Sequence, residues 1–234
     1  MKVIVTGGSG LLGRPTIREF KKAGCDVVGT AFSRAKYELL KLDLTDSTAV
    51  ENFIEAQQPD GRICKKRGIM LIYISTDYVF DGTAPPYEVE DKPNPLQFYG
   101  ETKLGGEEAI KSVYPEAVIL RVPILYGDTE YNGESAINVL IDVVLNHDKP
   151  TVVDNVSCRY PTNVEDVARV IKDLSVAKVK DHKDIKGIYH FTGQESITKY
   201  QVCEIVSKIL GAPIDHLTPQ NTIDKAASGL LCVT

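Results

Sequence analysis

Two short stretches carry side chains that could move a proton. STDYVFDG (75–82) follows an apolar run, and YGETK (99–103) places Tyr99 one helical turn before Lys103. A phenol has a pKa of about 10, so it needs a neighbouring group to exchange a proton near neutrality. Because residues four apart share one helix face, the Lys103 ammonium is expected to lower the pKa of Tyr99 and to reach a nicotinamide ribose. Thr76, at the carboxyl end of a predicted strand, is placed to hydrogen-bond the substrate oxygen with which Tyr99 would exchange a proton.

The Thr76, Tyr99 and Lys103 set has a second interpretation. Y-x-x-x-K is common in isolation and is usually structural, so its meaning depends on what surrounds it. Asp77 and Tyr78 follow Thr76 closely enough to line the same pocket, although Tyr78 could equally be packed in the core.

A glycine-rich turn near the N-terminus supplies that context. TGGSGLLG (6–13) follows the β-branched run KVIVT and opens a helical stretch. Gly7 would permit a tight turn, Gly10 would let the backbone approach a pyrophosphate, and Gly13 would let the helix pack against the sheet. The helix N-terminus would stabilise the phosphate charge. We therefore predict a dinucleotide site, with a purely structural turn as the alternative.

The residues after the second predicted strand indicate which dinucleotide would bind. An acidic residue there would accept hydrogen bonds from a ribose 2′-hydroxyl and favour NAD, but 31–34 reads AFSR and holds no carboxylate. Arg34 could instead bind a 2′-phosphate through its planar fork of donors. NADP is the predicted cofactor, and the alternative is that Arg34 is a solvated surface residue.

The elements that must position these residues alternate between strand and helix, which is the βαβ rhythm of a doubly wound sheet. We predict an α/β fold, a Rossmann-type parallel sheet with a small C-terminal lobe. The predicted division is a cofactor-binding domain over 1–150 and a partial lobe over 151–234, interleaved with the first. The expected strands are 2–6, 26–32, 39–44, 69–75, 117–125, 151–154 and 187–193. The expected helices are 11–22, 46–57 with Thr45 or Asp46 as cap, 100–112, 134–147, 163–176 and 198–210.

Composition excludes several classes of function. The 234 residues carry a net charge of −5, which argues against non-specific nucleic-acid binding. There is no apolar run long enough to span a bilayer and no leader-like N-terminus, so we expect the cytosol or the nucleus. The five cysteines show no C-x-x-C spacing and are expected to be reduced, and the four histidines have no partner at metal-ligand spacing, so no metal site is predicted.

One interval is too short for this fold. Only QQPDGRICKKRG (57–68) separates the predicted helix ending near Gln57 from the strand at 69, where another strand and helix are expected. Either the strand at 69–75 pairs directly with the first strand, or the chain is a shortened form with an impaired fold. The tail at 221–234 is weakly patterned and is expected to be frayed.

The motifs TGGSGLLG, STDYVFDG and YGETKLGGE together resemble the extended short-chain dehydrogenases/reductases, in particular the dTDP-4-dehydrorhamnose reductase branch. The resemblance implies that Thr76, Tyr99 and Lys103 assist hydride transfer from a nicotinamide cofactor to a sugar ketone. It also implies a cofactor-binding set: Thr6, Gly7, Gly10, Leu11, Leu12, Gly13, Arg34, Asp43, Leu44, Tyr99, Lys103 and Val122.

The second half of the chain resembles one family within that branch. DYVFDGTAPPYEVEDKPNPLQFYGETKLGGE (77–107), RVPILYGDTEYNGESAI (121–137) and CRYPTNVEDVARV (158–170) are similar to the β regulatory subunits of methionine adenosyltransferase, as is GIYHFTGQESITKYQVCEIV (187–206). This resemblance implies a non-catalytic regulatory subunit that binds NADP and modulates a catalytic α subunit. Two other hypotheses stay open: a working NADP-dependent reductase, and a shortened chain with no independent function.

Overall fold

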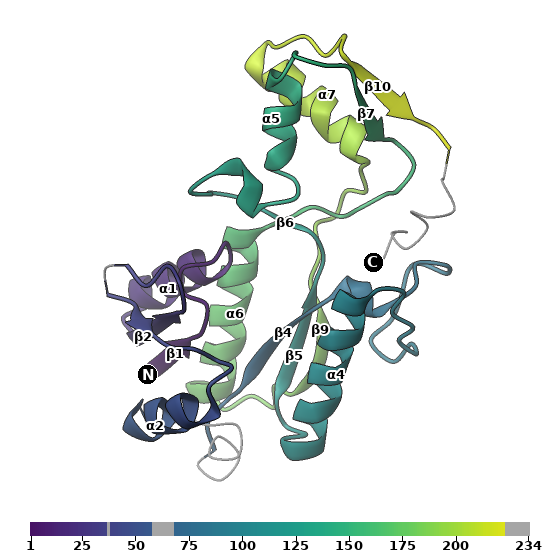
Figure 1. Ribbon diagram of the computed structural model, residues 1–234. Helices are drawn as coiled ribbons and strands as arrows, with labels where there is room; N and C mark the ends of the chain where they lie inside the picture. The colour runs from purple at the N-terminus through teal and green to yellow at the C-terminus, as the bar shows by residue number, and fades with distance from the viewer. Residues whose placement is uncertain (37, 58–67, 223–234) are drawn as a thin grey trace. The chain divides into compact units, whose positions relative to one another are not determined.

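A computed structural model of the chain describes residues 1–36, 38–57 and 68–222 (Figure 1). The chain forms two compact units, and each is built from several stretches of sequence. The first contains the described residues of Met1–Tyr73, Glu107–Ile119 and Val164–Ile188; the second contains those of Ile74–Gly106, Leu120–Asn163 and Tyr189–Thr234. The division at residue 150 stays a prediction.

The elements alternate as the sequence predicts. The strands are β1 (Lys2–Val5), β2 (Asp26–Ala31), β3 (Leu40–Lys41), β4 (Ile72–Thr76), β5 (Val118–Val122), β6 (Leu125–Tyr126), β7 (Thr151–Asp154), β8 (Thr162–Asn163), β9 (Gly187–His190) and β10 (Leu217–Gln220). The helices are α1 (Gly13–Lys22), α2 (Ser47–Gln57), α4 (Phe98–Val113), α5 (Val139–Leu145), α6 (Val164–Val179) and α7 (Lys199–Leu210), with 3-10 turns η1 (Asp77–Val79) and η2 (Asn132–Glu134).

Helix boundaries follow the capping residues. Asp46 is the cap of α2, since its Oδ1 accepts a hydrogen bond from the Ala49 N–H at 2.9 Å. At the other end of the chain, α7 closes at Gly211, whose φ of 64° is the left-handed conformation that glycine adopts without a Cβ clash. Both caps confirm the predicted helix ends.

Three parallel strands in the order β1-β2-β3 form the sheet of the first unit. Lys2 lies opposite Asp26 and Val5 opposite Gly29, while the Asp26 N–H donates to the Met1 carbonyl at 3.0 Å. Backbone groups alternate between the two edges of a strand, so those of Lys2 and Ile4 point away from β2. Helix α1 packs against α6 within this unit (Figure 1).

A second sheet has the order β4-β5-β9. The Val118 N–H donates to the Leu71 carbonyl at 2.9 Å, which joins the beginnings of β4 and β5, so these two strands run in the same direction. Their carboxyl ends therefore meet at one edge. All five residues of β5 are buried, as expected for a strand covered on both faces.

The C-terminal part of the second unit is a small lobe. Parallel strands β7 and β10 pair with Thr151 opposite Leu217, and α5 and α7 pack together beside them. Their buried side chains form one core: Ile137, Leu140, Val144, Val153, Val202, Cys203 and Leu217. The predicted small lobe is therefore present in this unit.

Two predicted elements differ in the structure. The expected strand at 117–125 is divided into β5 and β6 at Pro123, which has no N–H to donate to a ladder. The expected helix at 134–147 begins only at Val139, because Ser135 first uses its hydroxyl to accept from the backbone N–H groups of Ile137 and Asn138.

Direct pairing of the 69–75 segment with the first strand does not occur among the described strands. There β1 pairs with β2, and β4 belongs to the other three-stranded sheet. The interval at 57–68 was expected to lack a strand and a helix, and the tail at 221–234 was expected to be frayed. Residues 58–67 and 223–234, which make up most of these two segments, fall outside the described residues. Within the described part of the chain, no helix is both long and apolar enough to cross a bilayer.

Candidate functional site

The glycine-rich turn lies directly after β1 and leads into α1. Gly7 has a φ of 69°, and its carbonyl accepts from the Gly10 N–H at 2.9 Å. The Gly8 N–H donates to the Thr30 carbonyl at 2.7 Å, which ties the turn to the end of β2. A Cβ on Gly13 would lie 2.2 Å from the Gly7 oxygen, so only glycine permits this approach of helix and turn.

The same turn offers backbone donors to an anion. Among the described residues, none accepts a hydrogen bond from the backbone N–H groups of Leu11 or Leu12. These groups lie at the amino end of α1, where unpaired N–H groups and the helix dipole stabilise negative charge. The turn therefore fits a pyrophosphate.

Other predicted cofactor residues gather at the same edge of the first sheet. Arg34 follows the end of β2, and Asp43 and Leu44 follow β3, whose end is held by a 2.9 Å bond from the Leu42 N–H to the Ala31 carbonyl. The hydroxyl and N–H of Thr45 both donate to Asp43 Oδ1 and hold the pKa of this carboxyl below its usual value. Since the three strands are parallel, their carboxyl ends and the glycine turn share one edge.

Thr76, Asp77, Tyr78 and Tyr99 meet in the second unit. Thr76 ends β4 and is buried; its hydroxyl donates to Asp77 Oδ1 at 3.1 Å and accepts from the Tyr78 N–H at 3.3 Å. The rings of Tyr78 and Tyr99 lie edge to face with centroids 6.0 Å apart. A Cβ on Gly100 would lie 2.2 Å from the Tyr78 carbonyl, so α4 begins in close contact with η1.

The expectation that Lys103 lowers the pKa of Tyr99 is wrong for this structure. Burial raises the pKa of the Tyr99 hydroxyl and the charge of Asp77 raises it further, against the lowering effect of the hydrogen bond with Thr76. Lys103 Nζ donates to the Ile74 carbonyl at 2.5 Å. Sharing a helix face brings Lys103 to β4 without making its charge the dominant influence on the phenol.

The Asp77 carboxyl has a raised pKa. Burial raises its pKa from 3.8 to about 6, against the lowering effects of hydrogen bonds and of the Arg159 charge. Burial likewise raises the pKa of Tyr78, which Arg159 lowers through its charge and a hydrogen bond. Near neutrality these three residues therefore present one carboxyl group, Asp77, close to its titration range and two neutral phenols, Tyr78 and Tyr99.

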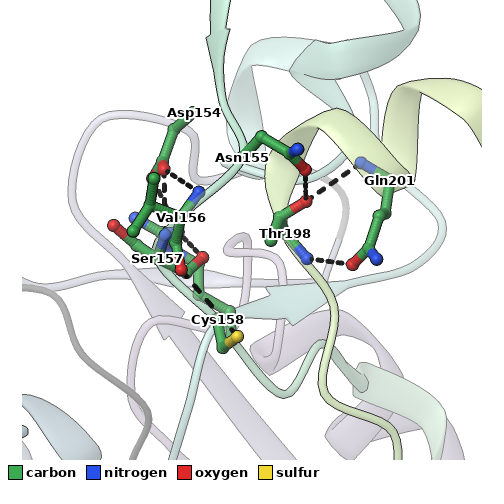
Figure 2. Close-up of polar contacts among 8 residues, drawn as sticks. Asp154, Asn155, Val156, Ser157, Cys158, Thr198 and Gln201 are labelled. Atoms are coloured by element: carbon green, nitrogen blue, oxygen red, sulfur yellow. Dashed lines mark hydrogen bonds and ion pairs between the residues drawn. The ribbon is translucent and has the colours of Figure 1, made fainter. Parts of the chain in front are cut away.

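Arg159 is a residue of this site that sequence reasoning missed. Its side chain is 9% exposed, and Nη1 donates to Asp154 Oδ2 at 3.2 Å and to the Ser157 carbonyl at 2.7 Å. Figure 2 shows the turn after β7, where Asp154 Oδ1 also accepts from the N–H groups of Val156 and Ser157, each at 2.9 Å. Burial would raise the pKa of Asp154, but these bonds and Arg159 bring it to about 2.

This turn is anchored to the start of α7 (Figure 2). Asn155 Oδ1 accepts from the Thr198 hydroxyl at 2.8 Å, and Thr198 forms a capping box with Gln201. Arg159 exchanges two backbone hydrogen bonds, each 2.9 Å, with Ile197. The motif CRYPTNVED contains Arg159, but spacing alone gave no reason to link it to Asp77.

The structure therefore places the predicted residues in two groups. Thr6, the three glycines, Leu11, Leu12, Arg34, Asp43 and Leu44 belong to the first unit, and Thr76, Tyr99, Lys103 and Val122 to the second. Val122 is the buried last residue of β5, beside the end of β4 in the sheet order.

Comparison with known proteins identifies the family. Residues 61–228 match the RmlD substrate binding domain, and residues 3–63 match the NAD dependent epimerase/dehydratase family. The chain resembles the solved dTDP-4-dehydrorhamnose reductase of Clostridium acetobutylicum, with a TM-score of 0.79 and 27% identity over 95% of this chain and 84% of that one. The dTDP-4-dehydrorhamnose reductase of Bacillus anthracis, solved with NADP, shares the fold at a TM-score of 0.81 and 21% identity, covering 100% of this chain and 88% of that one.

Relatives with higher identity carry a different name. The methionine adenosyltransferase 2 subunit beta of Xenopus laevis is 37% identical over 250 residues, which cover 93% of this chain and 75% of that protein; the Bos taurus protein matches equally well. A match of 250 residues that takes in only 93% of a 234-residue chain must contain gaps in this chain. The probable low-salt glycan biosynthesis reductase of Haloferax volcanii is 28% identical over 90% of the chain and 81% of that protein. The chain belongs to the RmlD substrate binding domain family, on the branch of the methionine adenosyltransferase 2 β subunits.

Proposed function

We propose that this chain is a regulatory subunit of a methionine adenosyltransferase, which binds NADP and modulates a catalytic α subunit in the synthesis of S-adenosylmethionine. The observation that carries the proposal is 37% identity to named β subunits over 93% of the chain. A reductase fold alone does not require such similarity, because the two solved reductases described above share the fold at 27% and 21% identity.

The choice of NADP rests on the first unit. The glycine turn fits a pyrophosphate, and Arg34 stands after β2 where an NAD site would carry a carboxylate. In this proposal Tyr99 and Lys103 hold the nicotinamide end of the cofactor and turn over no substrate. Their donors, a phenol with a raised pKa and an ammonium, suit hydrogen bonding to ribose hydroxyls.

Mixing the chain with a purified methionine adenosyltransferase α subunit tests the regulatory role. We expect the two to elute together in size-exclusion chromatography, and the methionine dependence of S-adenosylmethionine synthesis to change. A dTDP-4-dehydrorhamnose reductase of the same fold is the control and should do neither. Separate elution with unchanged methionine dependence would overturn the proposal.

A thermal melt with and without NADP tests the cofactor separately. A ligand that binds only the folded state adds roughly 2.7 kcal/mol at 100 times its dissociation constant. We expect one cooperative transition, whose midpoint temperature rises with NADP and rises less with NAD. A midpoint temperature that neither cofactor changes would remove NADP from the proposal. The mixing experiment would then decide the question of the partner by itself.

The second candidate function is an NADP-dependent reductase of a sugar ketone. It is favoured by the placement of Thr76 beside Tyr99 and by the similarity to the Haloferax volcanii reductase. Bound NADPH would supply the hydride, and Tyr99 would donate the proton to the ketone oxygen. Oxidation of NADPH in the presence of dTDP-4-dehydrorhamnose, abolished in Tyr99→Phe, would establish this activity; no oxidation would exclude it for that substrate.

A further inference from the structure

One asparagine of the second unit precedes a glycine in an exposed turn. Asn132-Gly133 is the only Asn-Gly pair in the sequence, and it begins η2. Gly133 is exposed, and within the described part of the chain no residue accepts a hydrogen bond from its backbone N–H. This backbone nitrogen therefore has neither a side chain of its own residue beside it nor a hydrogen bond to hold it.

An asparagine followed by glycine can lose its side-chain amide without an enzyme. The backbone nitrogen of Gly133 attacks the side-chain carbonyl carbon of Asn132, a five-membered succinimide closes, and the side-chain nitrogen leaves as ammonia. Water then opens the ring at either carbonyl, which leaves an aspartate or an isoaspartate at position 132. The reaction consumes one water and releases one ammonia, and nothing is oxidised or reduced.

The amide that this reaction removes ties η2 to helix α5. Asn132 Nδ2 donates to Asp142 Oδ1 at 2.7 Å, and η2 packs against α5. Helix α5 in turn contributes Leu140 and Val144 to the core of the small lobe. An aspartate at position 132 would lose the donor and bring a second carboxylate against Asp142. Because like charges in contact repel, the contact between η2 and α5 would weaken.

The neighbouring sequence supplies no basic residue to offset the new charge. Residues 122–148 contain no lysine or arginine, and three carboxylates, Asp128, Glu130 and Glu134, flank Asn132. We propose that Asn132 is a site of spontaneous deamidation, and that the carboxylate it forms releases η2 from α5. This inference goes beyond the proposed function and does not depend on it.

Peptide mass spectrometry after incubation of the folded chain tests the chemistry. We expect Asn132 to be replaced by aspartate and isoaspartate, while Asn138 and Asn146, which precede valine and histidine, keep their amides. Gly133→Ala should lose most of this conversion, because a methyl group hinders the attacking nitrogen. A Cβ at Gly133 would meet the ring of Tyr131 at 3.0 Å, and this exposed ring is free to turn aside, so the variant should fold.

A synthetic peptide of residues 126–137 gives the reference rate. Conversion of Asn132 in both the peptide and the folded chain supports the proposal. If the peptide converts and the folded chain keeps this amide, the fold protects the site and the proposal is overturned. Conversion of Gly133→Ala at the original rate would also overturn it, because the nitrogen of residue 133 would not be the attacking group.

Hydrogen exchange of the α5 amides tests the release of η2. In Asn132→Asp we expect these amides to exchange about threefold to tenfold faster, as for one lost hydrogen bond, with those of α1 unchanged. Combining Asn132→Asp with Asp142→Asn again sets an amide against a carboxylate, and this swapped pair should restore the original rate. Unchanged exchange in Asn132→Asp, or no recovery in the swapped pair, would overturn the release of η2 by charge.

Discussion

At the scale of single residues, Asp77 makes stability depend on pH. Its pKa is raised by burial from 3.8 to about 6, so the folded chain holds a proton that the unfolded chain has lost. Stability must therefore fall as pH rises from about 4 to about 6. We expect Asp77→Asn, which stays neutral, to stabilise the chain by up to about 3 kcal/mol at pH 7.5 and to change little at pH 4.

Chemical denaturation at the two pH values measures this effect. Asp215→Asn serves as control, because Asp215 is exposed and its replacement should change stability little at either pH. Destabilisation of Asp77→Asn at pH 7.5 would show that the hydrogen bond from Thr76 requires a charged acceptor.

Arg34 is the residue on which we expect the choice between NADP and NAD to depend. Arg34→Glu should weaken NADP binding more than about tenfold, because the 2′-phosphate loses a charge-assisted partner and meets a carboxylate. Binding of NAD, which has no 2′-phosphate, should be spared. Fluorescence titration with both cofactors measures the ratio, with Lys36→Glu at an exposed neighbouring position as the control. Equal loss of both cofactors would mean that Arg34 supports the fold.

At the scale of elements, two glycines in helices should respond oppositely to alanine. A Cβ on Gly13 would stand 2.2 Å from the Gly7 oxygen, whereas a Cβ on Gly105 of α4 meets no atom within 4 Å. Gly13→Ala should destabilise the chain by about 1–3 kcal/mol through this clash. Gly105→Ala should stabilise it by about 0.5–1 kcal/mol, since glycine is costly inside a helix. Urea denaturation measures both, and equal effects would contradict the packing of α1 on the turn.

The sequence predicts the elements that have strong local signals. Apolar periodicity and caps located α1, α2, α4, α6 and α7, and β-branched runs located β1, β2, β4 and β7. The sequence analysis missed β10, because Pro219 argues against a strand. The proline is tolerated there because β10 is an edge strand with only β7 beside it. Pairing with a distant strand is a tertiary effect that no local pattern contains.

The candidate site was predictable to a similar extent. Thr76, Tyr99 and the glycine turn are local motifs and are found at strand ends and helix starts as expected. Arg159 influences the pKa of Asp77 from a distant segment of the chain, a relation that exists only once the chain is folded. Partners of this kind depend on the assembled fold, as does the raised pKa of Tyr99.

At the scale of the whole molecule, regulation and catalysis make different demands on Tyr99. Tyr99→Phe removes the phenolic proton but keeps the ring against Tyr78. If the chain regulates an α subunit without chemistry of its own, we expect the methionine dependence of the mixed enzyme to be the same with Tyr99→Phe. The assay compares initial rates over a methionine series, and loss of the effect would make proton transfer part of the regulation.

The interleaving of the two units affects how the protein is made. Helix α1 leaves the ribosome well before its packing partner α6, which begins at Val164. Helix α1 also packs against β1 and β2, but the side of α1 that meets α6 stays uncovered until α6 is synthesised, and contacts so distant in sequence form slowly. The packing of the first unit is therefore completed only late in translation. A chaperone that shields exposed apolar helices should engage this chain from the emergence of α1 until after residue 188.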